Sequence, residues 1–530
     1  MSDRFHGTNS MSTDLFAFPS TLTGIELDPR RGLSKQLYEI LRQQILDGSL
    51  GGGIRLPASR DLARSLAISR NSVLRAYDQL YAEGFVEGRI GDGTYVVQLS
   101  DTGAGRQTGA RKKLSTKLPT GLHTGLCTAL STDTAEIPLK SPVEVIHSPA
   151  LKLLENHHLQ APPSDAPKAF RVGVPAFDLF PFALWGKLYA AFWRKPDLGQ
   201  LGYGAAAGEW RLRELIAVYL RSARGLHCTT EQIVITNGAQ HAISLCAQLL
   251  LTSGQGVAFE NPGYRAAGHA FAMAGGRLQG VAVDSEGMRC VDLEQADCQL
   301  AYVTPSHQYP TGAVMSLARR LELLAWARKR QGWIIEDDYD GEYRYSGSPL
   351  APLAALDQDG RVVYIGTFGK VAFPALRLGY LVLPNALVQP FSQRKAVDIR
   401  HTEIGVQAVM AQFIALGHFQ RHIRRMRRAA QSRRNAMFAG WPEDIPGCAA
   451  MPKGVAGLHV VVKVDSVARE TELIAKARSV GVEMNALSDY WLPDSSEPVD
   501  NRAGLVLGFA AVPEAAIADA LNRLRKAWSE

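Results

Sequence analysis

The feature that most constrains the fold is a regular alternation of short apolar segments with longer amphipathic segments, from about residue 166 to residue 530. The apolar segments include QIVITNG, GVAFENP, LAYVTPS, GWIIEDDY and RVVYIGTFGK, and amphipathic stretches such as LARRLELLAWARKR lie between them. Short apolar runs bounded by turn residues are typical of buried strands, and their alternation with helices indicates an α/β architecture with a mostly parallel sheet. No short-period repeat is present, which disfavours a solenoid or a propeller.

The remainder of the chain divides into segments of different composition. Residues 1–28 are rich in Ser, Thr and Asp without sustained periodicity, which is typical of a flexible N-terminal arm. Residues 29–98 carry helical periodicity that ends in a short β-like stretch, whereas residues 99–165 mix Gly, Ser, Thr and Pro as linkers do. The sequence therefore predicts two folded parts, residues 29–98 and 166–530, joined by a long linker.

Composition limits the function classes. Hydrophobic residues make up 46% and charged residues 21% of the 530 residues, the balance of a globular protein. No apolar run approaches the roughly 18 residues of a membrane span, and the N-terminus has no apolar core of signal-peptide length, so we expect a cytoplasmic protein without membrane segments. The six cysteines never form a C-x-x-C pair, so neither a structural zinc site nor any other metal is predicted. A net charge of +7 permits a nucleic-acid partner without requiring one.

Residues 34–98 contain the periodicity of three helices and a hairpin. The first helix covers 34–47, with Leu37, Leu41 and Ile45 on one face and Ser34 as the expected N-cap. A second helix starts in PASRDLARSL, with Ser59 as its expected cap, and a short turn leads to a third helix in SRNSVLRAYDQLYAEG. In that third helix, three residues at i, i+4 and i+7 face the core: Val73, Tyr77 and Leu80. FVEGRIGDGTYVV then predicts two short strands around a Gly-Asp-Gly turn.

Two helices joined by a tight turn and followed by a hairpin make a winged helix-turn-helix, whose second helix enters the DNA major groove. Arginine at the start of that helix can pair bidentately with guanine, and serine or asparagine can contact phosphates or base edges. The alternative interpretation of the same residues is a three-helix interaction domain with a solvated polar face.

The stretch LPASRDLARSLAISRNSVLRAYDQLYAEGFVEGRIGDGTYV resembles the GntR family of bacterial transcription regulators over its full length. The matching features are Pro-x-Ser-Arg before the second helix, Ser-Arg at the start of the recognition helix, and the closing Gly-x-Gly-Thr-x-Val of the wing. The resemblance implies an α+β winged helix-turn-helix that binds a double-stranded DNA operator through Arg60, Ser69, Arg70, Asn71 and Ser72, with Arg89, Gly91 and Gly93 at the wing tip. Some relatives carry Arg four residues after the recognition-helix Arg, where this chain has Leu74; a base contact by the neighbouring Arg75 is left open.

The second part of the chain carries chemistry at the ends of its apolar runs, where α/β sheets bind ligands. Bound pyridoxal phosphate needs a lysine for its aldehyde, a carboxylate for its ring nitrogen, a phenol for its ring hydroxyl, and a helix start, a hydroxyl and an arginine for its phosphate. The chain can supply each of these groups: Lys370, Asp337, Tyr339, Thr367, Arg377, the segment Gly238, Ala239 and Gln240 that opens a helix, and Tyr264 as a ring that could stack on the cofactor.

At these residues the chain resembles fold-type I aminotransferases, and as a whole it resembles the MocR subfamily of GntR regulators, which join a winged helix to an aminotransferase-like domain through a variable linker. The matching stretches include ITNGAQHAISL, AFENPGYRAAG, IIEDDYDGEYRYSG and YIGTFGKVAFPALRLGYLVLP. The resemblance implies a large subdomain at about 195–400, a small subdomain at about 401–530, and a homodimer. It also implies these roles: Lys370 forms the Schiff base, Asp337 pairs with the ring nitrogen, Tyr339 bonds the ring oxygen, Thr367, Arg377 and residues 238–240 hold the phosphate, Tyr264 stacks, and Tyr203 reaches a phosphate across the dimer.

Two positions depart from the pattern of these relatives. Gly369 stands directly before the lysine, where relatives commonly have Ser, so a hydroxyl beside the lysine is lost. Val506 stands where many aminotransferases carry the Arg that holds the substrate carboxylate, and Arg502 is a possible substitute. The second departure bears on amino-acid turnover more than on cofactor binding.

Three hypotheses follow. The first is a transcription regulator, not an enzyme, that senses pyridoxal phosphate or an amino compound and changes its operator binding. The second is an active pyridoxal-phosphate-dependent aminotransferase with an appended DNA-binding module, which the doubtful carboxylate clamp disfavours. The third is a DNA-binding protein whose cofactor pocket no longer functions.

Overall fold

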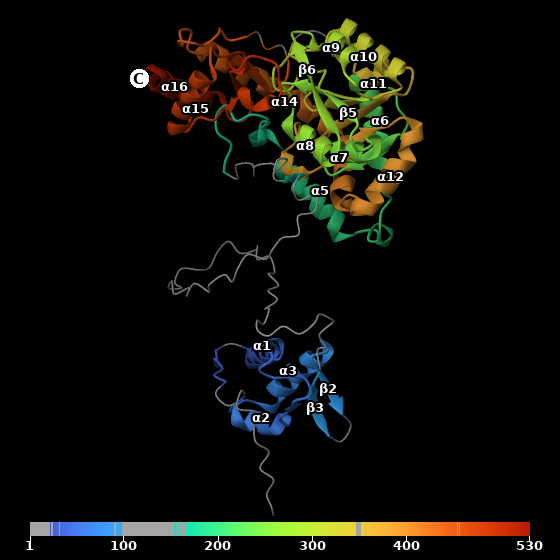
Figure 1. Cartoon of the computed structure of the whole chain (residues 1–530), viewed down its shortest axis with the longest axis vertical. Helices are drawn as coiled ribbons and strands as arrows, with labels where there is room; N and C mark the ends of the chain where they lie inside the picture. Colours follow the sequence, from blue (N-terminus) through green and yellow to red (C-terminus); the bar gives the residue numbers. More distant parts are fainter. Residues whose placement is uncertain are drawn as a thin grey trace, which may run out of the picture. The chain divides into compact units, whose positions relative to one another are not determined.

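The computed structural model of the chain (Figure 1) describes residues 22, 25–30, 32–89, 92–97, 153–154, 157, 165–345, 351–452, 454 and 456–529. It divides into two compact units, one within residues 1–138 and one within residues 139–530, and each is described by itself. Most of the predicted N-terminal arm and linker, as well as Gly91 of the predicted wing tip, lie outside the described residues. Within the described part of the chain, no helix is both long and apolar enough to cross a membrane.

The first unit is a winged helix-turn-helix, as the sequence predicts. Its three-stranded antiparallel sheet has the order β1-β3-β2, with the wing formed by β2 and β3. β1 was not predicted, because two residues are too short for a recognisable alternation of polar and apolar side chains. The elements in chain order are α1 (Leu33–Leu46), β1 (Arg55–Leu56), α2 (Ser59–Ser65), α3 (Arg70–Ala82), β2 (Val86–Arg89) and β3 (Gly93–Val96).

The core of the first unit contains the predicted apolar faces. Leu37 and Leu41 of α1 and Val73 and Leu80 of α3 are completely buried in one cluster. Burial of these side chains, each worth roughly 1.5–3 kcal/mol, holds α1 against α3 and thereby fixes the exposed start of α3.

Two predicted helix caps are wrong. α1 begins at Leu33 and α2 at Ser59, and the residues before them, Gly32 and Ala58, are the N-caps. The backbone already turns there, because the Gly32 carbonyl accepts from Lys35 N at 3.0 Å and the Ala58 carbonyl from Asp61 N at 2.9 Å. Ser34 and Ser59 therefore lie inside their helices.

The second unit contains an eight-stranded, mostly parallel sheet of order β4-β11-β10-β9-β8-β5-β6-β7, in which β11 and β7 are antiparallel to their neighbours. Alternate residues of a strand face opposite sides. Val257 and Phe259 of β5 accordingly pack in one cluster with α7, α8 and α12, whereas Ala258 packs in another with α9, α10 and α11. The elements of this sheet and its cover are α5 (Phe182–Arg194), α6 (Trp210–Arg224), β4 (Ile233–Thr236), α7 (Ala239–Leu250), β5 (Gly256–Asn261), α8 (Arg265–Met273), β6 (Arg277–Asp284), β7 (Gly287–Met288), α9 (Cys290–Gln295), β8 (Leu300–Val303), α10 (Leu317–Arg330), β9 (Trp333–Asp338), α11 (Leu353–Leu356), β10 (Val362–Thr367), β11 (Gly379–Val382), α12 (Asn385–Ile399) and α13 (Ile404–Ala415).

A smaller antiparallel sheet of order β12-β14-β13 forms the C-terminal part of this unit, drawn in orange and red in Figure 1. Phe170, from the beginning of the unit, makes an isolated bridge to Gly508 at the end of β14. The start of the unit is therefore attached to its C-terminal sheet. The remaining elements are α14 (His418–Gly440), β12 (His459–Lys463), α15 (Val467–Ser479), β13 (Asn485–Ala486), β14 (Gly504–Gly508) and α16 (Glu514–Ser529).

Candidate functional site

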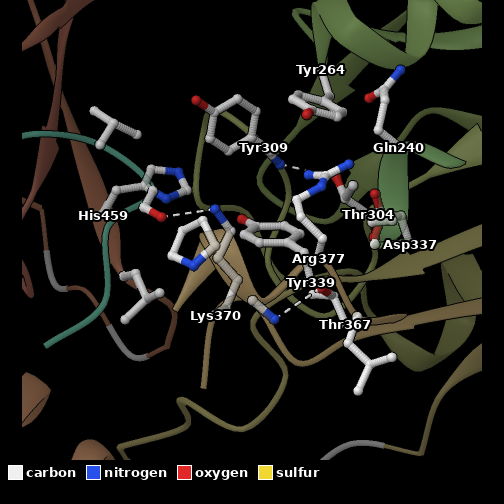
Figure 2. A pocket seen from close by; sticks show the side chains of 18 of the residues that line it. Gln240, Tyr264, Thr304, Tyr309, Asp337, Tyr339, Thr367, Lys370, Arg377 and His459 are labelled. Atoms are coloured by element: carbon white, nitrogen blue, oxygen red, sulfur yellow. Dashed lines mark hydrogen bonds between the residues drawn. The ribbon is translucent and has the colours of Figure 1, made fainter. Parts of the chain in front are cut away.

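A cavity of about 270 Å³ opens at the carboxyl ends of the central strands of the large sheet (Figure 2). Parallel strands end at the same edge of a sheet, so residues far apart in the sequence meet there. The cavity brings together the nine residues predicted to contact pyridoxal phosphate within one chain: Gly238, Ala239, Gln240, Tyr264, Asp337, Tyr339, Thr367, Lys370 and Arg377.

Lys370 follows β10 and points into this cavity. Its Nζ donates a hydrogen bond to the Gly173 carbonyl at 2.8 Å. Burial lowers the pKa of Lys370, and the carboxylates of Asp340 and Asp337 offset part of that effect. A lowered pKa increases the fraction of the neutral amine, which is the form that attacks an aldehyde.

Asp337, near the end of β9, has one carboxylate oxygen engaged and one available. Its Oδ2 accepts from Tyr302 Oη at 2.7 Å, whereas Oδ1 is buried without a hydrogen-bond partner among the described residues. Burial raises the pKa of Asp337 to about 6, and the Tyr302 hydrogen bond opposes that shift. A buried acceptor of this kind fits a protonated ring nitrogen, whose positive charge would favour the ionised carboxylate.

The turn between β4 and α7 forms an anion cradle. Gly238 has φ +83°, a conformation favourable to glycine, and a side chain there would crowd the Arg377 guanidinium at 3.4 Å. Arg377 Nη2 donates to the Asn237 carbonyl at 3.0 Å, and no side chain of the described residues caps the start of α7. Unpaired helix N–H groups beside an arginine and the Thr367 hydroxyl are a suitable site for a phosphate.

Tyr339 belongs to a buried polar network. Its hydroxyl donates to the His307 carbonyl at 2.9 Å and lies 3.1 Å from His307 Nδ1, which in turn lies 3.0 Å from Asp340 Oδ2. This network fixes the phenol at the cavity wall beside Lys370, as Figure 2 shows. A side chain at Gly457 would collide with the His307 ring, so the small sheet's leading loop closes against the same network.

Tyr264 lines the cavity beside Tyr309, with ring centroids 5.6 Å apart and the rings perpendicular. Burial raises the pKa of Tyr264 to about 12, so the phenol is neutral near pH 7. Tyr203 does not line the cavity of its own chain and is 90% exposed, with Arg400 5.9 Å from its ring centroid.

Sequence reasoning missed several residues that line or support the cavity. Tyr302 is the penultimate residue of the apolar run LAYV, next to the strand of Asp337, and the rule that strand ends carry function could have identified it. Tyr309 and His459 also line the cavity, and no such signal marks them in the sequence. His459 comes from the small sheet, far along the chain from the other lining residues.

In the first unit, the predicted DNA-contacting residues gather at the start of α3. Ser69 caps this helix by accepting from Ser72 N at 3.1 Å, and Arg70 Nε donates to Ser59 Oγ at 3.3 Å. Arg60, Ser69, Arg70 and Asn71 are exposed, Ser72 is half-buried, and Arg75 is exposed one position beyond the half-buried Leu74.

Arg89 and Gly93, the two predicted wing residues that the structure describes, lie on β2 and β3. Arg89 pairs with Glu87 at 3.0 Å, and its guanidinium lies 4.3 Å from the Tyr95 ring centroid. Gly93 has φ +137°, and a side chain there would meet Arg55 Nε at 2.8 Å. These contacts orient the strands on both sides of the wing tip.

Comparison with protein families divides the chain in the same way. Residues 33–96 match the family described as bacterial regulatory proteins, gntR family, and residues 199–488 match aminotransferase class I and II. Whole-chain relatives include the probable rhizopine catabolism regulatory protein MocR of Rhizobium meliloti, 33% identical over 94% of both chains. They also include the pyridoxine biosynthesis transcriptional regulator PdxR of Corynebacterium glutamicum, 30% identical over 92% of this chain and 95% of that one.

Among solved structures, the second unit is similar to aminotransferases. Kynurenine aminotransferase of Pyrococcus horikoshii is 26% identical with a TM-score of 0.61, covering 73% of this chain and 95% of that chain. The α-aminoadipate aminotransferase LysN of Thermus thermophilus is 25% identical with the same TM-score of 0.61, covering 72% and 95%. The second unit therefore has the fold-type I aminotransferase architecture that the sequence predicts.

Proposed function

This chain belongs to the MocR subfamily of GntR-type transcriptional regulators, and from that membership we propose that its second unit holds pyridoxal phosphate on Lys370. As a member, the chain is a DNA-binding regulator. We further propose that it senses pyridoxal phosphate or an amino compound, and that the occupied cavity changes the affinity of the first unit for its operator. Such a change requires that the ligand bind the two arrangements of the protein with different affinities.

The observation that carries this proposal is the convergence of nine matching residues on one cavity, with an unpaired Asp337 oxygen at its base. Pyridoxal phosphate would supply an aldehyde, a basic ring nitrogen and a phosphate dianion. Lys370 would hold its aldehyde, Asp337 would accept from its ring nitrogen, and Tyr339 would contact its ring oxygen. The start of α7 and the Thr367 hydroxyl would donate hydrogen bonds to the phosphate, Arg377 would supply a positive charge, and Tyr264 would cover the ring face.

The DNA contacts are proposed for the exposed start of α3 and for the wing. Arg60, Ser69, Arg70, Asn71 and Ser72 would contact one half-site, with Arg89 and Gly93 beside the minor groove or the backbone. We place the protein in the cytoplasm, where its operator lies.

We propose a homodimer in which Tyr203 reaches the phosphate site of the partner. The supporting observation is that Tyr203 is exposed together with Leu198 and Leu201, because a group of large exposed apolar side chains marks a protein–protein interface.

Spectroscopy tests the attachment. The purified protein, reconstituted with pyridoxal phosphate, should absorb visible light, and Lys370→Ala should abolish that absorbance. Lys395→Met is the matched control, because Lys395 is a buried lysine whose pKa burial lowers to about 7, yet it does not line the cavity. If the visible absorbance survives in Lys370→Ala and disappears in Lys395→Met, the cofactor is attached to Lys395 and the proposal is wrong.

Turnover as an aminotransferase is the second candidate, because the aminotransferase fold and the nine cavity residues are both present. Steady-state assays on a panel of amino acids distinguish the two functions. Sustained transamination at about 1 per second or faster, the ordinary enzyme range, would favour the enzyme.

A further inference from the structure

The small sheet closes one side of the cavity with apolar and aromatic side chains. Leu458 and His459 line the cavity itself. Val461, Leu487, Tyr490 and Val506 form a buried cluster against which Val172 and Tyr309 of the cavity wall pack.

The polar side chains on this side of the cavity form hydrogen bonds with neighbouring protein groups. Tyr309 and Tyr490 hydroxyls lie 2.9 Å apart, and Asn485 Nδ2 donates to the Tyr490 hydroxyl at 2.7 Å. His459 Nε2 donates to the Pro310 carbonyl at 2.8 Å. Burial lowers the pKa of His459 well below its ordinary value, so its ring is neutral and carries a lone pair on Nδ1.

Two cations line the cavity among the described residues, and both have other roles. Arg377 belongs to the phosphate cradle, and Lys370 is the attachment point.

Arg502, the possible carboxylate clamp, is directed elsewhere. Its Nε and Nη2 donate to the Glu497 carbonyl at 2.9 and 2.7 Å, and Nη2 also donates to the Ser495 carbonyl at 2.7 Å. It therefore holds the loop before β14 and does not line the cavity.

We propose that the ligand admitted beside Lys370 is a primary amine that carries no carboxylate on its amine-bearing carbon. A carboxylate in that place would lose its water against Leu458 and the aromatic rings that line the cavity without gaining a cation from the described residues, which is strongly unfavourable. An alkyl or aromatic substituent would instead gain from burial on the same wall. This inference rests on the proposed function and specifies the chemical class of its ligand.

Matched pairs of amine and parent amino acid test the proposal. Phenethylamine and phenylalanine, tyramine and tyrosine, and isoamylamine and leucine are titrated into the cofactor-loaded full-length protein, and binding is followed by calorimetry and by the visible spectrum. The amine should bind at least tenfold more tightly than its parent amino acid, a difference of about 1.4 kcal/mol.

The variant Arg502→Ala tests whether Arg502 binds the carboxylate of a bound amino acid. If Arg502 only holds its loop, the variant keeps the wild-type preference for amines. Loss of amino-acid binding in the variant would make Arg502 the clamp and overturn the proposal.

The wild-type titrations decide the matter even if the variant fails to fold. An amino acid that binds as tightly as its amine contradicts the proposal, and so does the failure of every amine to bind. In either case, a protein that is coloured and binds its DNA leaves the proposed function standing.

Discussion

Single residues of the second unit show how burial changes the charge of acidic groups next to the cavity. Glu260 at the end of β5 is 1% exposed, and its Oε2 accepts from the Thr304 hydroxyl at 2.7 Å, Thr304 N at 3.2 Å and Gln308 Nε2 at 3.2 Å. Burial nevertheless raises the pKa of Glu260 to about 7, because these three hydrogen bonds offset only part of the desolvation. Glu260 thus connects β5 to the loop that carries Tyr309.

Stability should therefore depend on pH through Glu260. Its folded pKa lies above its ordinary value of 4.5, so the folded state binds more protons than the unfolded state between those values, and stability falls as pH rises through that range. In the variant Glu260→Gln, the fall in the free energy of unfolding over this pH range should be smaller by up to ~3 kcal/mol. Urea unfolding of the second unit, followed by tryptophan fluorescence at about pH 5 and about pH 8, measures it.

The exposed Glu443→Gln is the matched control and should retain the wild-type decline. If the free energy of unfolding falls equally with rising pH in Glu260→Gln and in the wild type, Glu260 is already ionised in the folded protein at the lower pH.

Among the elements, α3 is the one that we propose to recognise the DNA sequence. Its inner face is held by Val73, Ala76, Tyr77 and Leu80, and its first turn is fixed by the Ser69 cap. The Tyr77 hydroxyl donates to the Pro57 carbonyl at 2.9 Å, which connects the helix to the segment before α2. The exposed start of α3 is thus presented on a rigid support, as base recognition requires.

Arg70→Ala should weaken binding to a duplex that the protein selects from a random pool by about tenfold to a hundredfold, the usual cost of one arginine–guanine contact. The reason is loss of a bidentate donor at the start of α3. Fluorescence anisotropy with the selected duplex and a scrambled duplex measures affinity and preference.

Arg64→Ala removes the same charge from the exposed face of α2, where Arg64 lies 3.8 Å from Asp61, and is not a predicted contact. Its effect should be smaller and similar for both duplexes. Equal losses in the two variants would exclude Arg70 from base recognition.

The elements also show what a sequence can predict. The apolar runs GWIIEDDY and RVVYIGTFGK are sufficient to place Asp337 and Lys370 at one edge of a sheet, because parallel strands end at the same edge. The caps of α1 and α2 were misplaced by one or two residues, because a serine beside a helix start predicts a cap only when the backbone has not already turned. His459 could not be predicted, because its position depends on how the small sheet packs on the large one.

At the scale of the whole molecule, the chain combines a DNA-binding unit with a cavity suited to an aldehyde cofactor. The family shows that both units belong to one regulator. In the sensor that we propose, occupancy of the cavity changes DNA affinity, and typical couplings between two sites amount to roughly 5- to 150-fold.

Affinity for the selected duplex, measured for the wild type and for Lys370→Ala with and without pyridoxal phosphate, tests the central claim most directly. We predict that the cofactor changes the affinity of the wild type at least about fivefold and leaves that of Lys370→Ala unchanged. The same affinity for the loaded and unloaded wild type, or the same response in Lys370→Ala, would contradict a regulator that senses through this lysine.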